Sequence, residues 1–222
     1  GNESYEFKNI AGNVILKRTI CSIDEAADTY YIYDYRGNLA FVLPPNYQEE
    51  PSLDLYAYQY KYDGQGNCTW KKLPGCEPIY MKYDLSGRMT YLQDGNLRKK
   101  GLWEFCVYDK LGRLAVQGTT ASISDVSKIH VYALYTGAGI LDGYQLNGTT
   151  FTAKSLLITN FYDDYTFIEK QNASEQSILH LNAAQALDAA FPSNSSQAPI
   201  LRVVLSLRAS TAAPVGSGSL LR

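Results

Sequence analysis

The chain has 222 residues, of which 45% are hydrophobic, and its 20 Lys and Arg residues against 22 Asp and Glu residues give a formal net charge of −2 at pH 7. A chain of this length can bury a sizeable core as one or two domains. Charges of both signs are spread along it, which argues against a nucleic-acid binder, and no apolar run reaches the roughly 20 residues of a membrane-spanning helix.

Tyrosine dominates the aromatic residues, with 19 copies against seven phenylalanines and two tryptophans. It suits a half-exposed β surface, because its ring packs while its hydroxyl reaches water or a backbone group. In the segment YAYQYKY the tyrosines alternate with other residues, which predicts a β-strand with four rings on one face. These residues are Tyr56, Tyr58, Tyr60 and Tyr62.

One short sequence motif recurs through the first half of the chain at spacings of about 20 to 30 residues. Its copies are FKNIAGNVILKR, YIYDYRGNLAFVL, YKYDGQGNCTWKKL, MKYDLSGRMTYL and CVYDKLGRLAVQG. Each has an Asp or Asn, a glycine three residues later, and then Asn or Arg. The paired positions are Asn9 and Gly12, Asp34 and Gly37, Asp63 and Gly66, Asp84 and Gly87, and Asp109 and Gly112.

The residue types in this motif are those that a tight turn requires. An Asp or Asn at the first turn position accepts hydrogen bonds from nearby backbone amides, and the glycine adopts the positive φ of a type I turn with a G1 bulge. Each copy is therefore predicted to be a β-hairpin. One hairpin is not stable alone in water, so successive hairpins must pair edge to edge. The predicted fold is all-β, a long twisted and curved antiparallel sheet that forms an open arc.

Four copies carry Tyr-Asp before the turn and Gly-Asn or Gly-Arg after it, and they resemble the YD repeats of bacterial Rhs proteins. The LPP and LPG stretches at residues 43–45 and 73–75, with the phrase EPIYMKYDLSGR, resemble the Rhs-like proteins of Bacteroidetes in particular. The resemblance covers about residues 5–118. It continues loosely through NFYDDYTF, which keeps Tyr162-Asp163 but has Phe167 where the turn would need a glycine.

The resemblance implies a function. In that family, YD-repeat chains wind a β-sheet into a hollow shell that encloses a C-terminal toxin, and related repeats occur in teneurin-like adhesion proteins. A DPxG-type self-cleavage motif and a compact toxin-like domain are absent from this sequence. We therefore expect a non-enzymatic scaffold segment of a surface or secreted protein. Its expected partners are other segments of the parent protein, a toxin domain, a surface protein or a glycan.

Three regions are predicted along the chain. Residues 1–118 hold the five hairpins, and residues 119–170 continue the sheet in degenerate form, with a strand in KIHVYALYTG, a type I′ hairpin at Asn147-Gly148 and a strand pair in TAKSLLITNFYDDYTFIE. Residues 171–222 form a C-terminal segment in which 173–191 have helical propensity and 200–208 fit a strand before a tail.

The sequence offers little for catalysis or metal binding, and no catalytic residue, metal or cofactor is expected. GAGILDG lacks the glycine that a dinucleotide fingerprint needs at Asp142 and is predicted to be a loop. His130, in strand-like KIHVYAL, and His180 are isolated, and Asp163-Asp164 more plausibly mark a degenerate turn than a carboxylate site. The repeated Asp side chains are expected to be occupied by backbone amides.

Two further questions stay open at this stage. The four cysteines are expected to be buried free thiols, with a Cys68–Cys76 bridge as the alternative. The tyrosines are expected to be cross-strand packing pairs, each contributing about 0.2–1 kcal/mol, while the alternative is a glycan-binding platform formed by residues 56–62. An open sheet also leaves edge strands that can pair between chains.

Overall fold

The computed structural model describes residues 3–139, 141–162 and 205–208. Strands dominate these residues, as predicted, and the chain divides into two compact units whose segments alternate along the sequence. The first unit contains Gly1–Phe105, Thr120–Val131 and Gly148–Thr152, and the second contains Cys106–Thr119, Tyr132–Asn147 and Ala153–Arg222.

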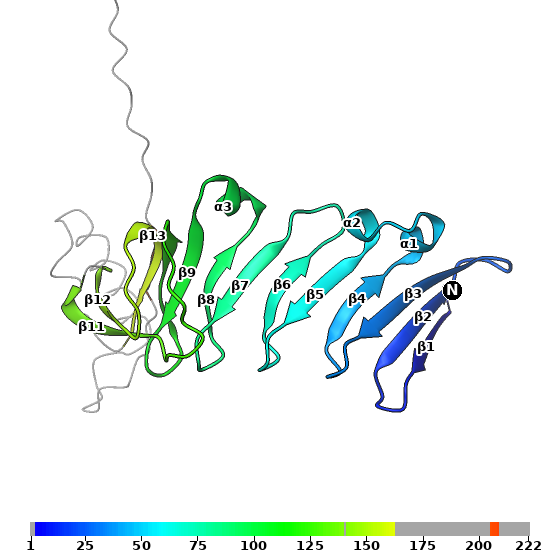
Figure 1. The fold of residues 1–222 in the computed structure, drawn as a ribbon, viewed down its shortest axis with the longest axis horizontal. Helices are drawn as coiled ribbons and strands as arrows, with labels where there is room; N and C mark the ends of the chain where they lie inside the picture. Colours follow the sequence, from blue (N-terminus) through cyan, green and yellow to red (C-terminus); the bar gives the residue numbers. More distant parts are fainter. Residues whose placement is uncertain (1–2, 140, 163–204, 209–222) are drawn as a thin grey trace, which may run out of the picture. The chain divides into compact units, whose positions relative to one another are not determined.

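The first unit is a long antiparallel sheet in which strands lie beside one another in chain order (Figure 1). Consecutive hairpins build it, which confirms the prediction of hairpins paired edge to edge. Its strands are β1 (Ser4–Lys8), β2 (Val14–Ile20), β3 (Ala26–Tyr33), β4 (Leu39–Leu43), β5 (Tyr58–Tyr62), β6 (Cys68–Lys72), β7 (Ile79–Tyr83), β8 (Met89–Gln93) and the start of β9 (Trp103–Tyr108).

The two edges of this unit differ. The repeated turns follow one edge, and the short helices α1 (Pro45–Glu49), α2 (Leu53–Tyr56) and α3 (Gly95–Lys99) follow the other (Figure 1). The helices were not predicted from the sequence. Side-chain caps begin two of them, since Ser52 Oγ accepts from the Leu55 amide at 3.4 Å and Asp94 Oδ1 from the Leu97 amide at 2.7 Å.

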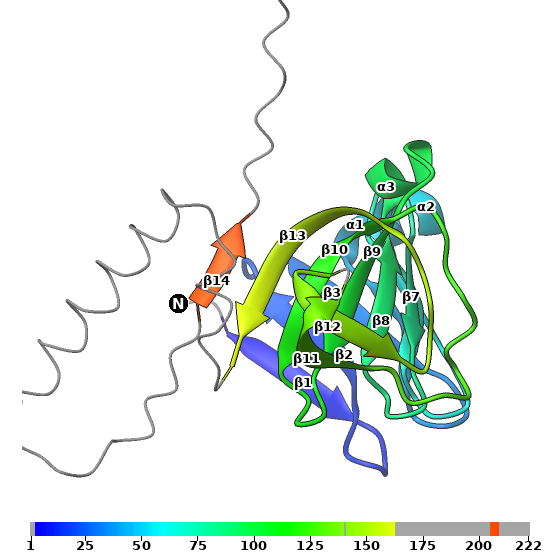
Figure 2. The same ribbon diagram turned by 90° about the vertical axis from the view of Figure 1, so that its left-hand side faces the viewer.

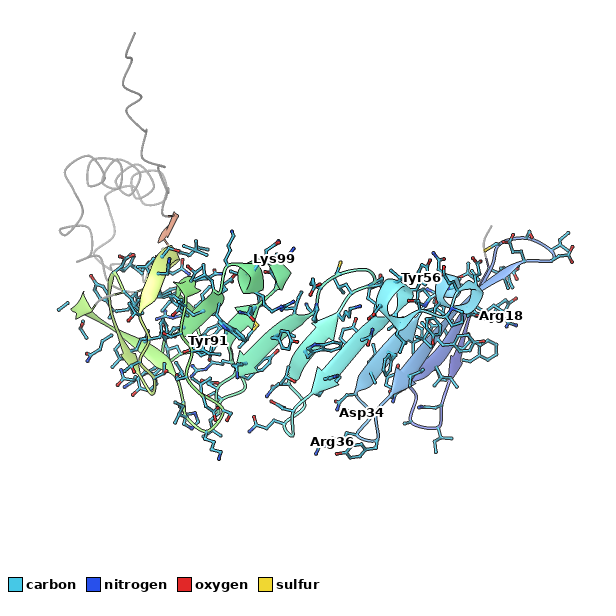
Figure 3. All side chains as sticks on the ribbon, turned by 45° about the horizontal axis from the view of Figure 1, so that its top comes forward. Arg18, Asp34, Arg36, Tyr56, Tyr91 and Lys99 are labelled. Atoms are coloured by element: carbon cyan, nitrogen blue, oxygen red, sulfur yellow. The ribbon has the colours of Figure 1, made fainter. Side chains whose placement is uncertain are left out.

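The prediction of a strand from Tyr56 to Tyr62 is wrong at its start. Tyr56 is the last residue of α2, and its hydroxyl donates to Glu50 Oε2 at 3.0 Å. It lies at the edge opposite the turn of Asp34 (Figure 3). The N-cap at Ser52 favours a helical turn over continued alternation, so β5 begins only at Tyr58.

The core of the first unit lies around β8 and β9. Tyr91 and Phe105 are 1% and 0% exposed, and the ring of Phe151 lies 5.9 Å and 4.5 Å from theirs. No residue of β1 to β4 is buried, and Phe7 and Ile32 are 47% and 45% exposed. The N-terminal strands therefore form a sheet whose faces are only partly covered within this unit.

The second unit combines sheet strands with a separate hairpin (Figure 2). The end of β9, then β10 (Leu114–Thr120), β13 (Ala153–Phe161) and β14 (Leu205–Arg208) are neighbours in that order. β11 (Tyr132–Gly139) pairs with β12 (Gly143–Asn147). Rings of Tyr135, Tyr144 and Phe161 meet at centroid distances of 5.3, 5.5 and 6.0 Å and pack the unit.

The predicted type I′ hairpin at Asn147-Gly148 is wrong. That turn needs positive φ at both central residues, but Asp142 is the only non-glycine with positive φ among the described residues. β12 ends at Asn147 and pairs back with β11. Gly148 instead allows a close approach, because a Cβ there would lie 2.3 Å from the carbonyl oxygen of His130.

Other predictions need smaller corrections. Gly137–Gly139 belong to β11 rather than to a loop, and a strand follows where a dinucleotide fold would need a helix. β11 begins at Tyr132, so His130 precedes the strand predicted for it. The strand predicted at 200–208 is observed as β14 over its last four residues.

Some predictions lie outside the described residues. They are the helix at 173–191, the Asp163-Asp164 turn, His180, and the second strand of the pair predicted in TAKSLLITNFYDDYTFIE.

The repeated turns lead to a first prediction. Gly112 has φ +79, and no atom lies within 4 Å of a Cβ placed there. Gly112→Val should therefore destabilise the protein through backbone strain alone, by about 1–3 kcal/mol, whereas Gly112→Asn should cost less because Asn tolerates positive φ. Thermal unfolding measures this. Gly64→Ala, at a turn position without positive φ, is the control, and a wild-type melting temperature for Gly112→Val would refute the turn assignment.

Candidate functional site

The repeated turns share one hydrogen-bond pattern. At Asp34, Oδ1 accepts from the amides of Arg36 and Asn38, both at 2.9 Å. The same two bonds occur in the other four copies, with Asn9, Asp63, Asp84 and Asp109 as acceptors. The glycines have φ between +72 and +87. The repeated Asx residue therefore closes its own turn.

In the four copies that carry aspartate, the second carboxylate oxygen accepts from the side chain that follows the glycine. Asp34 Oδ2 accepts from Asn38 Nδ2 at 3.0 Å, and Asp84 Oδ2 from Arg88 Nη2 at 2.8 Å. Asn67 and Arg113 make the equivalent bonds to Asp63 and Asp109, at 3.0 and 2.6 Å. This explains the Asn or Arg that follows the glycine in these four copies, for which the sequence alone offered no role. Over the residues with a described structure, no group of three or more His, Cys, Asp or Glu side chains could hold a metal ion.

These contacts lower the pKa of three of the carboxyl groups. The Asn38 side chain is the main cause at Asp34. At Asp63 and Asp84, burial is the largest single influence and acts to raise the pKa. Hydrogen bonds from Asn67 or Arg88 and from backbone amides together outweigh burial and lower the pKa.

A pH dependence follows from these lowered pKa values. The stability contributed by the ionised carboxylates is present above the unfolded-state pKa of about 3.9 and is lost as the pH falls toward the lower folded-state values. We expect a nearly constant melting temperature from about pH 7 to about pH 5 and a steep fall below about pH 4. The variant Asp34→Asn keeps the amide acceptor and should flatten part of this fall; an unchanged profile would contradict the assignment.

In three of the repeat copies, the tyrosine before the aspartate links neighbouring hairpins. The hydroxyls of Tyr33, Tyr62 and Tyr83 donate to the carbonyls of Val14, Leu39 and Cys68 at 2.9, 3.0 and 3.0 Å. Tyr162 donates to Leu114 O at 2.9 Å in the same way. Each accepting residue lies two positions after the glycine of the preceding turn.

The backbone shows why a side chain is needed there. Pairing between β2 and β3 stops at Leu16, pairing between β4 and β5 at Phe41, and pairing between β6 and β7 at Trp70. Each of these residues lies two positions beyond the accepting carbonyl, so the tyrosine hydroxyl continues the hydrogen bonding where the backbone ladder has ended. The recurring Tyr-Asp pair is visible in the sequence. The backbone carbonyl that accepts from the tyrosine could be located only in the structure.

The fourth turn is covered by the segment that precedes β11. The Val131 amide donates to Asp84 Oδ2 at 3.1 Å, and the Leu85 amide donates to Ile129 O at 2.9 Å. Ser86 Oγ and His130 Nδ1 lie 2.6 Å apart. No acidic side chain orients the His130 ring within the described part of the chain, so the pair lacks the third group of a nucleophile site. It fastens this segment to the turn.

All four cysteines are free thiols, so the alternative of a Cys68–Cys76 bridge is wrong. The expectation that they are buried holds for Cys106 only, because Cys21 and Cys76 are exposed and Cys68 is half-buried. Burial raises the pKa of Cys68.

The predicted tyrosine surface is only partly exposed. Tyr58 is 37% exposed, Tyr60 and Tyr62 are half-buried, and the hydroxyl of Tyr62 is engaged with Leu39. These three rings lie on the sheet face opposite Lys61, because neighbouring strand residues point to opposite faces. A glycan-binding role for residues 56–62 stays a prediction.

The structure instead gathers other aromatic residues in a groove of about 540 Å³ in the first unit. Trp70, Tyr80 and Trp103 line it together with Lys61, Lys82 and the segment 125–127. It draws polar side chains from different hairpins. Sequence reasoning missed this groove, although the only two tryptophans of the chain were visible.

No known family model matches this chain, and no curated protein matches its sequence. Among solved structures, the chain is similar to part of a crystal structure of TcdB2-TccC3, with a TM-score of 0.45, 14% sequence identity and coverage of 74% of this chain and 7% of that chain. A crystal structure of TcdB2-TccC3 without its hypervariable C-terminal region gives a TM-score of 0.43, 14% identity and coverage of 72% and 9%. This chain therefore spans less than a tenth of the length of either.

Proposed function

We propose that this chain is a non-enzymatic scaffold, a wall segment of an Rhs-like YD-repeat protein of the type that the Bacteroidetes proteins represent. In the whole protein it forms part of a β-shell that encloses a C-terminal toxin. It acts at the cell surface or after secretion, and its partners are other segments of the parent protein and the enclosed domain.

The use of the repeated polar groups supports this proposal. The aspartates accept hydrogen bonds on both carboxylate oxygens, and three of the repeat tyrosines donate to backbone carbonyls. A catalytic acid must be available to substrate and hold a proton near the working pH, whereas the pKa values of Asp34, Asp63 and Asp84 are lowered. The repeated aspartates and tyrosines therefore stabilise the turns and join neighbouring hairpins.

The partly covered faces of the first unit fit the same role. Tyr5 and Phe7 on β1 and Ile32 on β3 are 50%, 47% and 45% exposed. β1 and β3 flank β2 in the same sheet. Exposed apolar side chains gathered on one sheet are typical of surfaces that contact other protein. Within the described residues, no helix is both long and apolar enough to cross a membrane.

Protease protection in the full-length natural protein tests the proposal. A shell predicts that the C-terminal domain stays intact while exposed loops of the wall are cut, and that Gly112→Val increases its cleavage while the control Gly64→Ala does not. Mass spectrometry of the fragments follows both. If the C-terminal domain is cut as fast in the intact protein as when it is isolated, the enclosure is wrong.

A further inference from the structure

Strand β1 lies at one end of the sheet, where β2 is its only neighbour among the described strands (Figure 1). All five residues of β1 are exposed. Three later copies of the repeat are joined to the preceding hairpin by the tyrosine before the aspartate, but Lys8 stands at that position in the first copy. The first copy therefore lacks the side chain that joins one hairpin to another.

The outer edge of β1 presents backbone groups in a regular order. The Ile20 amide donates to Glu3 O at 2.9 Å, so Glu3 bonds toward β2. Alternate residues of an antiparallel strand bond to the same side, so Phe7 also bonds toward β2, whereas the N–H and C=O groups of Glu6 and Lys8 point outward. The extra residue at the register shift lies on β2, so β1 itself stays regular. A second strand can therefore pair with this edge.

The side chains of β1 divide between the two faces of the sheet. Tyr5 and Phe7 share one face and are 50% and 47% exposed. Glu6 and Lys8 share the other face, where Glu6 Oε2 and Lys8 Nζ lie 3.9 Å apart and about half of each side chain stays exposed. Lys17 of β2 lies directly opposite Glu6 in the ladder. A partner strand would therefore meet a fixed order of charges on one face and aromatic rings on the other.

We propose that β1 pairs with β1 of a second copy of this chain, antiparallel and around a two-fold axis at Phe7. In this register Glu6 of each copy lies opposite Lys8 of the other, and the outward N–H and C=O groups of these two residues bond to one another. The four charges then alternate in sign around the axis. On the other face the two Phe7 rings form a cross-strand aromatic pair. The pairing is additional to the scaffold role and does not depend on it.

The charges on β1 select this register and this partner. A two-fold axis at Glu6 would place two Glu6 carboxylates directly opposite each other, which destabilises a sheet. An axis at Tyr5 would place Glu6 opposite Ser4 and form no ion pair. Shifts by one residue would oppose groups that point outward to groups that point toward β2. The order of charges is therefore complementary to itself, which favours a second copy over an unrelated strand.

Sedimentation velocity of the whole chain over a range of concentrations tests this pairing. We expect a monomer–dimer equilibrium with a dissociation constant between about 1 μM and 1 mM, because one short strand buries less area than a stable interface does. Amide hydrogen exchange locates the contact. The amides of Glu6 and Lys8 should exchange more slowly as the concentration rises, while the Phe7 amide, bonded to β2 in either state, should change less.

Charge reversal tests the register. Glu6→Lys and Lys8→Glu should each weaken self-association by about tenfold or more, because each replaces two opposite-charge pairs across the axis with two like-charge pairs. An equal mixture of the two variants should associate again, since every charge then faces its opposite. Lys99→Glu is the control, because Lys99 is exposed on α3 and lies far from Arg18 of β2 (Figure 3). It should associate as the wild type does.

Four results would overturn the proposal. They are a monomer at every concentration, assemblies that grow beyond the dimer, equal losses in Glu6→Lys and Lys99→Glu, and a mixture of the two charge variants that associates no better than either alone. None of them affects the scaffold function, which protease protection measures separately.

Discussion

Asp84→Ala is expected to destabilise the protein by about 3–5 kcal/mol, the range found when one partner of a buried ion pair is removed. Asp84 is 2% exposed and accepts from the amides of Ser86, Arg88 and Val131 as well as from the Arg88 guanidinium. Alanine leaves all of these donors without the carboxylate that accepts from them at a buried position. The free energy of unfolding, from urea titration followed by tryptophan fluorescence, measures the loss.

Asp34→Ala is the matched control for this prediction. Asp34 makes the same turn bonds, but its turn is half-exposed, and water can replace the lost acceptor. Its expected cost is about 1 kcal/mol, that of a lost hydrogen bond at an accessible site. Equal losses in the two variants would show that the cover over the fourth turn contributes nothing, and would contradict the contacts of Val131 described here.

Removing three repeat tyrosine hydroxyls together is expected to cost about 3 kcal/mol. The triple variant Tyr33→Phe, Tyr62→Phe, Tyr83→Phe keeps the rings but leaves the carbonyls of the preceding hairpins without their donors, at about 1 kcal/mol each. The hydroxyls donate to three different carbonyls, so the costs should add, with any coupling expected between Tyr62 and Tyr83, which both lie next to Cys68. Urea unfolding of the single, double and triple variants measures the sum.

Tyr58→Phe on β5 is the control for the tyrosines, because its ring is 37% exposed and it does not precede a turn aspartate. It should lie within about 0.5 kcal/mol of the wild type, as surface substitutions do. A triple variant as stable as Tyr58→Phe would mean that ring packing alone joins the hairpins. Faster amide exchange next to the turns in the triple variant would locate the loss at the hairpin junctions.

The repeat therefore has two structural parts, one that makes contacts within its own turn and one that contacts the preceding hairpin. The aspartate and glycine act within five consecutive residues and shape each turn, as at Asp34 to Asn38. The tyrosine acts on the preceding hairpin, as Tyr62 does on Leu39. A wall can be extended by repeating such a unit because each copy closes itself and also bonds to its predecessor.

The order of the hairpins in the first unit was predictable from the sequence because the turn chemistry is local, whereas the separate β11–β12 hairpin was not. The Asx side chain, the amides it binds and the positive-φ glycine lie within five residues, so a repeated phrase is enough to place the hairpins and their order. Alternation of tyrosines indicated strands for the same reason. The prediction failed where another local preference competed, as at Tyr56, where the Ser52 cap favours a helical turn.

Only the tertiary structure decided which groups from distant parts of the chain meet. The carbonyl that accepts from Tyr62 is 23 residues away, and Val131 reaches Asp84 across 47 residues. The groove joins Trp70 to Asp125 in the same way. Such contacts depend on strand register and on where a segment distant in sequence packs against the sheet. Neither can be predicted from the types of a few consecutive residues. The sequence by itself therefore determined the repeated hairpins and their order, while folding decided which groups join one hairpin to the next and which side chains line the groove.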